Sequence, residues 1–308
     1  MTGKPLIVIL GPTGVGKTAL GVEIARTLNG EIVSADSRQV YRYMDIGTGK
    51  PHAQQLAAVP HHLLDIVNPD DNLTLARYQK LAYAAIDDIH QRGKLPLLVG
   101  GTGQYITAVV EGWSIPEVPP DEKLRAELET FAVEHGSETL HERLRQMDTE
   151  AANNIDHRNV RRVIRAIEVT TITGQKFSDL QRKMPPLYRM LHLGLTMAER
   201  AQVYERADQR VDAMMAAGFL DEVRSLLEMG YPRTLPSMSG LGYAQLTTHL
   251  LDGVPLEEAV AKTKNDTHDF IRRQYTWFRG HDLGTLWHNS NEIQTDVLIE
   301  QVATFVRS

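Results

Sequence analysis

One stretch near the N-terminus combines glycines, a lysine and a threonine at characteristic positions: Gly11, Pro12, Thr13, Gly14, Val15, Gly16, Lys17 and Thr18. Its spacing matches G-x-x-x-x-G-K-[ST], the phosphate-binding loop. The glycines let backbone N–H groups converge on phosphate oxygens, and the helix expected over 17–28 adds its positive end. Lys17 supplies a mobile cation, and the Thr18 hydroxyl suits Mg²⁺. The pattern predicts a polyphosphate site but leaves open which polyphosphate binds and which bond breaks.

Two further polar residues follow predicted strands. Asp36 comes directly after the apolar stretch 31–35, and Thr102 lies in a glycine-rich loop after 95–99. In a parallel sheet both would lie at the edge that carries the phosphate loop. Asp36 could be a base that grips a second substrate, a carboxylate associated with Mg²⁺, or a helix N-cap, a position that Ser37 could equally take. Thr102 could donate to a phosphate or a nucleophile, or it could be another N-cap.

A basic segment stands out in this acidic chain. The whole chain carries a formal charge of −6, whereas residues 157–183 hold seven basic and two acidic residues, a net charge of +5. Four arginines repeat at i, i+3, i+4 and i+7, and an apolar set with the same spacing lies on the opposite helix face. We interpret the basic face as a surface for a phosphate backbone; the alternative is a solvated, salt-bridged face. The arginines are Arg158, Arg161, Arg162 and Arg165, and the apolar residues are Val160, Val163, Ile164 and Ile167.

A second cluster mixes cations with aromatic residues over 272–279, a combination suited to unstacked nucleotides. Its aromatic residues could instead belong to the core. Two other patterns carry little weight. Residues 263–266 match a guanine-binding motif but lie in an expected helix, and loop histidines explain His52, His61 and His62 better than a metal site does.

The elements that must position these residues alternate between strand and helix. We expect strands at 6–10, 31–35 and 95–99, with helices over 17–28 and 75–91, which is typical of a helix-covered parallel sheet. A proline-rich stretch at 115–120 suggests a domain boundary, and residues 121–182 have helical patterns. We further expect a strand at 191–195, helices over 197–229 and 256–279, and a loop at 232–242. The prediction is an α/β core of 1–117 and 190–308 with a helical insertion of 118–189.

The composition limits the class of protein. The chain has 308 residues and no cysteine, which excludes disulfides, thiolate metal sites and a cysteine nucleophile. The apolar run at 6–10 is too short for a membrane span or a signal-peptide core. We expect a cytoplasmic protein that has no membrane partner and acts as a monomer.

Several stretches together resemble the tRNA dimethylallyltransferases, also called tRNA isopentenyltransferases. They follow one another in order along almost the whole chain. Gly14 and Gly49 stand where this family often has alanine, and Ser239-Gly240 where some members have Arg-Cys. The matching stretches are 11–18, 34–51, 61–69, 97–105, 159–169, 210–223, 240–245 and 272–280.

The resemblance implies transfer of a dimethylallyl group from dimethylallyl diphosphate to the exocyclic amine (N6) of an adenosine. This adenosine lies just 3′ of the tRNA anticodon. The resemblance also implies a nucleotide-kinase-like core, with the phosphate loop and Arg210 holding diphosphate and Mg²⁺ bound at Thr18. Lys17 then stabilises the leaving group, Asp36 orients the amine and takes its proton, and Thr102 assists.

The same resemblance implies that the insertion holds the anticodon stem. The expected tRNA contacts come from the loops near Asp36, from the insertion and from the C-terminal helices. They are Asp36, Ser37, Arg38, Gln39, Thr102, Arg125, Arg158, Arg161, Arg162, Arg165, Gly242, Tyr243, Gln245, Arg272, Arg273, Gln274, Trp277 and Arg279.

Three alternatives stay open. A small-molecule kinase would place ATP in the loop and an alcohol at Asp36, but it would have no use for a basic insertion. A prenyltransferase acting on free adenylate would not need residues 121–182 to grip an RNA stem. A nucleotide switch would need a guanine-binding loop, and the match at 263–266 lies in an expected helix.

Overall fold

The computed structural model describes residues 3–181, 183–184, 187–281 and 283–308 and divides the chain into two compact units. The core unit comprises residues 1–110 and 186–308, and the inserted unit comprises 111–185. The insertion was expected over 118–189. Residues 111–117 join the inserted unit, where Trp113 forms an antiparallel β-bridge with Lys183. At the other boundary, Arg189 already belongs to a core strand. Residues 182, 185 and 186 of the predicted insertion lie outside the described residues.

The core unit is built on a six-stranded parallel sheet with strand order β3-β2-β4-β1-β5-β6. The α/β prediction is confirmed, and so are the four predicted strands, each within two residues at either end. The two edge strands, β3 and β6, were not predicted because they are only two and four residues long. The strands are β1 (Pro5–Leu10), β2 (Gly30–Ala35), β3 (His61–His62), β4 (Leu95–Gly100), β5 (Arg189–Thr196) and β6 (Leu286–Asn289).

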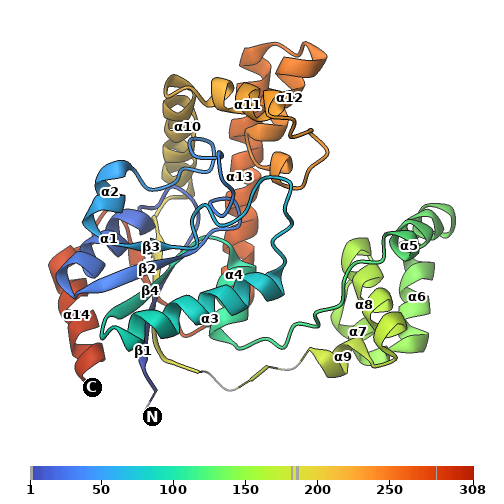
Figure 1. The fold of residues 1–308 in the computed structure, drawn as a ribbon, viewed down its shortest axis with the longest axis horizontal. Coiled ribbons are helices and arrows are strands. Elements are labelled where there is room, and N and C mark those ends of the chain that lie inside the picture. Colours follow the sequence, from blue (N-terminus) through green and yellow to red (C-terminus); the bar gives the residue numbers. More distant parts are fainter. Residues whose placement is uncertain (1–2, 182, 185–186, 282) are drawn as a thin grey trace. The chain divides into compact units, whose positions relative to one another are not determined.

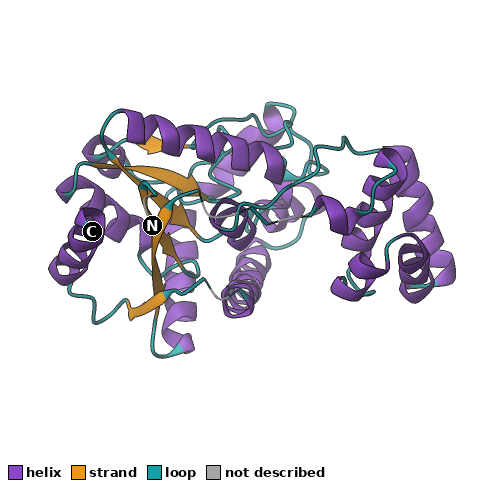
Figure 2. Ribbon diagram, turned by 90° about the horizontal axis from the view of Figure 1, so that it is seen from below, coloured by secondary structure: helices purple, strands orange, loops and turns teal. Residues whose placement is uncertain are grey.

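Helices cover both faces of this sheet (Figure 2). Alternate residues of β1 divide between the two faces: Leu6, Val8 and Leu10 pack with the helices of one face, and Ile7 and Ile9 with those of the other. Because both faces are covered, the central strands are apolar throughout. One face carries α3 (Leu75–Gln91) and α4 (Gly103–Val110), and the other carries α1 (Lys17–Thr27) and α14 (Thr295–Arg307).

Of the remaining helices of the core unit, α10, α11 and α12 lie beyond the carboxyl ends of the strands, and α13 runs from there down to α4 (Figure 1). The helix predicted over 197–229 is two helices, because Gly218 takes a left-handed conformation (φ 99°) that ends the first. The helix predicted over 256–279 is confirmed as α13. These elements are α2 (Ala53–Ala58), α10 (Arg200–Ala216), α11 (Phe219–Glu228), the short 3₁₀ helix Ser237–Ser239, α12 (Tyr243–Asp252) and α13 (Leu256–Gly280).

The inserted unit is helical, with its own apolar core around Leu140, Val163 and Ile167. The apolar face predicted for residues 160–167 is buried in that core. The helices are α5 (Glu122–His135), α6 (Ser137–Met147), α7 (Thr149–Asn154), α8 (Val160–Thr173) and α9 (Phe177–Leu180). Across both units, none of the helices in the described ranges is long and apolar enough to cross a membrane.

Candidate functional site

The phosphate loop connects β1 to α1, as its spacing predicts. Gly11 has a φ of 143°, and a Cβ there would lie 2.3 Å from the Leu195 carbonyl oxygen, so a larger residue would push the loop off β5. Gly16 takes the left-handed conformation directly before α1. The Lys17 ammonium donates to the Pro12 carbonyl oxygen at 2.6 Å, across the loop. The loop is therefore folded around its lysine.

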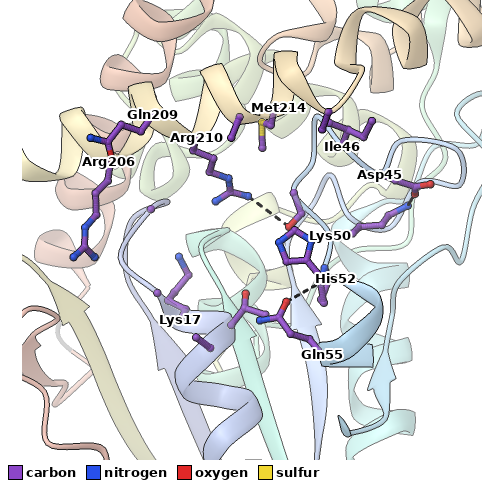
Figure 3. A pocket seen from close by; sticks show the side chains of 18 residues that line it. Lys17, Asp45, Ile46, Lys50, His52, Gln55, Arg206, Gln209, Arg210 and Met214 are labelled. Atoms are coloured by element: carbon purple, nitrogen blue, oxygen red, sulfur yellow. Dashed lines mark hydrogen bonds and ion pairs between the residues drawn. The ribbon is translucent and has the colours of Figure 1, made fainter. Parts of the chain in front are cut away.

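A pocket of about 810 Å³ opens beside this loop (Figure 3). Gly14, Lys17 and Thr18 form one wall, while Arg206 and Arg210 come from α10. In Figure 3, Lys17 and Arg210 reach into the cavity from opposite sides. We call this the phosphate pocket. Its size and its cations suit a substrate that carries a diphosphate.

The cations of the phosphate pocket have few protein counter-charges. Burial lowers the pKa of Lys17 to about 7, although the Asp36 carboxylate opposes the shift, and Arg210 lowers it further. Burial also lowers the pKa of Arg210, again opposed by Asp36. The Arg210 guanidinium donates to the Thr13 hydroxyl at 3.2 Å. A bound polyphosphate would compensate both cations, so the electrostatics favour an anionic ligand here.

A second pocket, of about 330 Å³, contains Asp36 and Thr102. Arg210 and Met214 line both this Asp36 pocket and the phosphate pocket, so the two cavities share a wall. Ligands in the two pockets would meet near Thr13, which also lines the Asp36 pocket. The prediction that Asp36 and Thr102 lie at the same sheet edge as the phosphate loop is confirmed.

Thr102 lies at the N-cap position of α4, where its carbonyl oxygen accepts from the Tyr105 and Ile106 N–H groups, whereas the capping interpretation of Asp36 is wrong. No helix follows β2 within the described residues 36–50; instead, Asp36 Oδ1 accepts from the Arg38 N–H at 2.8 Å in a turn. The Thr102 hydroxyl accepts from the Ser37 N–H at 3.0 Å and donates to Ser37 Oγ at 3.3 Å. These contacts join the loops after β2 and β4, and they leave the second carboxylate oxygen of Asp36 available to a ligand.

A loop that we did not single out as functional separates the two pockets. In the loop of residues 45–50, Asp45, Ile46, Gly49 and Lys50 line the phosphate pocket. Residues 47–48 of the same loop line the Asp36 pocket. The Glu222 carboxylate of α11 accepts hydrogen bonds from three successive N–H groups of this loop, those of residues 45–47. A single glutamate on an amphipathic helix gives no such signal in the sequence.

Several predicted tRNA contacts instead hold the core unit together. Arg38 donates to the Pro236 carbonyl oxygen at 2.8 Å, and the Gln39 side chain donates to the Gly49 carbonyl oxygen at 3.2 Å. Gln274 is 6% exposed; its side-chain oxygen accepts from the Thr13 N–H at 3.0 Å, and its nitrogen donates to the Gly101 carbonyl oxygen at 2.9 Å. We reassign Gln274 to positioning the phosphate loop against the loop after β4.

The predicted tRNA contacts at the start of α12 and at Trp277 also make hydrogen bonds within the core unit. Tyr243 is 1% exposed and Gln245 is also buried; the Gln245 side chain accepts from the Gly242 N–H. The Trp277 indole donates to Thr107 and packs against Gly103, where a Cβ would lie 2.1 Å from the ring. These residues are therefore held by contacts within the core unit, and their contact with tRNA stays a prediction.

The three arginines near the end of α13 differ in their surroundings. Arg272 pairs with Asp269, and Arg279 lies over the Tyr275 ring. Arg273 lies over the Phe270 ring, 5.8 Å from its centre, and lines the Asp36 pocket. Of the arginines in the cluster predicted over 272–279, Arg273 is therefore the one that lines the Asp36 pocket.

The two rejected patterns have structural explanations. Thr263 and Asp266 lie within α13, where the Asp266 carboxylate accepts from the Gln245 side chain, so 263–266 is not a guanine-binding loop. His61 contacts the Val59 carbonyl oxygen, and His62 contacts Glu31. No group of three or more histidines, aspartates or glutamates among the described residues could hold a metal ion.

The arginines of the inserted unit separate into two kinds. Arg158 precedes α8, which begins at Val160 after the N-cap Asn159, and it pairs with Asp156; its predicted place on the helix face is wrong. Arg161 and Arg162 are exposed on the first turn of α8, and their side chains have no hydrogen-bond or ion-pair partner among the described residues.

Arg125 and Arg165 share a buried partner. The Glu168 carboxylate, which is 0% exposed, accepts from Arg125 at 2.8 Å and from Arg165 at 2.6 Å. Arg165 also donates to the Val118 carbonyl oxygen at 3.0 Å. These two arginines therefore fasten the start of the inserted unit onto α8, and their contact with RNA stays a prediction.

Comparisons with known proteins agree with the site. The family model described as IPP transferase matches residues 39–281. A tRNA dimethylallyltransferase of Roseiflexus castenholzii is 56% identical over 89% of this chain and 90% of the relative, and one from Roseiflexus sp. is 52% identical over 98% of each. The solved tRNA isopentenylpyrophosphate transferase of Bacillus halodurans is 40% identical, with a TM-score of 0.72 over 99% of this chain and 96% of that one.

A eukaryotic dimethylallyltransferase, described as acting on tRNA, is 28% identical to this chain. It has a TM-score of 0.80 over 97% of this chain and 77% of its own length. The family match covers most of the chain, and the reported sequence relatives are all tRNA dimethylallyltransferases. This chain belongs to the IPP transferase family, whose members among these relatives are tRNA dimethylallyltransferases.

Proposed function

We propose that this protein transfers a dimethylallyl group from dimethylallyl diphosphate to N6 of the adenosine 3′ of a tRNA anticodon, releasing diphosphate. One observation carries the proposal: a cationic phosphate pocket and the Asp36 pocket share the wall made by Arg210 and Met214. Substrates bound in these two neighbouring pockets would come together beside the residues that line both. The names of the relatives support a dimethylallyl donor and a tRNA acceptor.

The residues of the site suit each step of this substitution. The bond from C1 of the allyl group to the diphosphate oxygen breaks, and a bond from C1 to the adenine N6 forms. Lys17, Arg210 and the backbone N–H groups of the phosphate loop stabilise the charge on the departing diphosphate. The amine of adenine is a weak nucleophile, so a carboxylate that orients it and takes its proton, the role proposed for Asp36, accelerates the attack. Thr102 keeps Ser37 and the Asp36 turn in place.

We include Mg²⁺ bound at the Thr18 hydroxyl in the proposal. Thr18 lines the phosphate pocket next to Lys17, which fits an ion that takes most of its ligands from diphosphate oxygens. When bound, the ion would add positive charge beside the leaving group. The proposal also includes a monomer and a cytoplasmic location, and a tRNA substrate fits that location.

Labelled dimethylallyl diphosphate tests the proposal against its rivals. The purified chain is incubated with Mg²⁺ and either unmodified tRNA, free AMP, or ATP with small nucleosides. We expect label in the tRNA fraction, on the adenosine 3′ of the anticodon, and release of diphosphate. Label in free adenylate alone would favour the adenylate prenyltransferase, and ATP consumption without prenyl transfer would favour the kinase.

The lowered pKa of Lys17 predicts how donor binding depends on pH. The empty loop loses its lysine proton above about pH 7, whereas a bound anion keeps it. The affinity for dimethylallyl diphosphate should therefore fall as pH rises above about 7, by up to about tenfold per pH unit. The measurement is the affinity for dimethylallyl diphosphate at several pH values, determined by calorimetry for the wild type and for Lys17→Met, which has no proton to lose at this position. Because protonation of the ligand affects both proteins alike, the difference between their pH slopes reports on Lys17. Equal pH slopes for the two proteins would contradict the prediction.

The exposed arginines of α8 predict a salt effect on tRNA binding. In the variant Arg161→Gln/Arg162→Gln, the log K against log salt slope should become shallower by up to about 1.5, because two phosphate contacts are lost. KM for tRNA should rise far more than kcat falls, since these residues would contact the RNA backbone and not the reacting amine. The matched control is Arg143→Gln/Arg145→Gln on α6, with melting curves for all proteins. If both double variants keep the wild-type slope, the face is only solvated and Arg273 becomes the main candidate for RNA contact.

A further inference from the structure

The loop of residues 45–50 is held from α11 by one side chain. The Glu222 carboxylate accepts from the N–H groups of Asp45 at 2.8 Å, Ile46 at 2.7 Å and Gly47 at 3.1 Å. It also accepts from the Tyr243 hydroxyl at 2.6 Å. Three successive N–H groups that converge on one anion form a strong, charge-assisted arrangement. The carboxylate thus determines where the first half of the loop lies.

The loop fits tightly against the side chains behind it. A Cβ at Gly47 would lie 2.1 Å from the Phe219 ring and 2.7 Å from the Tyr243 ring, so only glycine allows this approach. At the other end, Lys50 pairs with Asp45 at 2.6 Å and donates to the Tyr41 carbonyl oxygen at 2.7 Å. The loop is fastened at both ends, and what lies between forms the wall beside Arg210.

The position of this loop controls the groups that face the two substrates. The Gly49 carbonyl oxygen accepts from Arg210 at 3.5 Å, and a Cβ at Gly49 would lie 1.7 Å from the same guanidinium. Arg210 in turn donates to the Thr13 hydroxyl of the phosphate loop. On the acceptor side, Gln39, three residues after Asp36, donates to the Gly49 carbonyl oxygen. A shift of the loop would therefore move Arg210 and disturb the Asp36 turn.

We propose that Glu222 is a positioning residue for the transfer reaction: by holding residues 45–47, it keeps Arg210 directed at the diphosphate. This inference rests on the proposed function, since it assigns diphosphate to the phosphate pocket. Glu222 does not line either pocket, and so it acts through the loop and not on substrate. The buried side chains of α11 are Phe219, Val223 and Leu226, so the apolar packing of this helix remains when Glu222 is replaced by glutamine.

A double-mutant cycle on the binding of inorganic diphosphate tests this role. The four proteins are wild type, Glu222→Gln, Arg210→Gln and the double variant, titrated calorimetrically with Mg²⁺ present. The glutamine keeps the shape of Glu222 but removes its charge and places a donor opposite the loop N–H groups. We expect Glu222→Gln alone to weaken diphosphate binding by about tenfold, and by less than about twofold when Arg210 is already replaced.

The control is Asp221→Asn on the same helix. Asp221 is exposed and pairs only with Arg224 in the contacts of the described residues, so this variant removes one charge without touching the loop. It should bind diphosphate as the wild type does, and all variants should melt within a few degrees of it. Tyr243→Phe removes one of the four contacts to Glu222 and should have a smaller effect than Glu222→Gln.

Two results would overturn the proposal. One is equal binding by Glu222→Gln and Asp221→Asn; the other is a full tenfold effect of Glu222→Gln in the Arg210→Gln background, which would show that the glutamate does not act through Arg210. A parallel transfer assay separates this outcome from failure of the proposed function. If wild type binds diphosphate with the expected cycle but prenylates no tRNA, the positioning role stands and the reaction assignment fails.

Discussion

Asp36→Asn should lower kcat by roughly 10²–10⁴-fold, the range expected when a positioned general base is lost. The variant keeps a side-chain oxygen that can accept from the Arg38 N–H, so the turn after β2 should keep its shape. What it loses is the ability to take the proton from the adenine amine. The measurement is single-turnover prenyl transfer with saturating tRNA and dimethylallyl diphosphate.

The donor side provides the control for Asp36. Because the Asp36 carboxylate raises the pKa of Lys17, this pKa should be lower in the variant, and the two proteins should be compared over a series of pH values below 7. Dimethylallyl diphosphate should then bind nearly as well as to the wild type. Loss of Mg²⁺ and diphosphate binding, with normal chemistry once both are saturating, would instead support the interpretation of Asp36 as a carboxylate associated with the metal.

Lys17→Ala is expected to lower kcat by at least about 10²-fold, the scale of removing one electrostatic contact to a developing charge. The ammonium lies inside the loop, where it donates to the Pro12 carbonyl oxygen and faces Arg210 across the phosphate pocket. Burial strengthens its interaction with the leaving diphosphate, since water screens it poorly there. Steady-state transfer kinetics with excess Mg²⁺ measure the effect.

The affinity for tRNA should barely change in Lys17→Ala, because Lys17 does not line the Asp36 pocket. Filter binding of tRNA and a melting curve are therefore the controls. Lys17→Arg keeps the charge but not the shape of the ammonium, and it should recover only part of the activity. Normal turnover by the alanine variant would remove the phosphate loop from the reaction.

The sequence by itself was sufficient for the phosphate loop and most of the sheet. The loop is a contiguous stretch of eight residues whose glycine conformations and helix start depend on near neighbours, so its pattern carries its structure. The central strands are covered on both faces, and continuous apolar runs such as 6–10 make them recognisable. Asp36 and Thr102 could be placed at the site because parallel strands bring their carboxyl ends to one edge.

Sequence patterns were less informative for charged residues on helices. The pair Arg165–Glu168 was visible as an i, i+3 contact, but Arg125 reaches the same carboxylate from 43 positions away. Arg158 matched the helical spacing although the helix begins only after Asn159. The spacing of residues indicates which of them could share a helix face. It does not indicate where the helix begins or which side chains of that face already form ion pairs within the protein.

Tertiary structure alone decided how the two pockets adjoin. Arg210, Glu222 and Gln274 come from three different helices and reach loops more than 150 positions away in the chain. Gln274 and Tyr243 look like polar surface residues in the sequence, yet both are buried and hydrogen-bonded. Such contacts form only after distant segments pack, because a buried polar group takes whichever partner the fold brings within reach, and no local pattern records that choice.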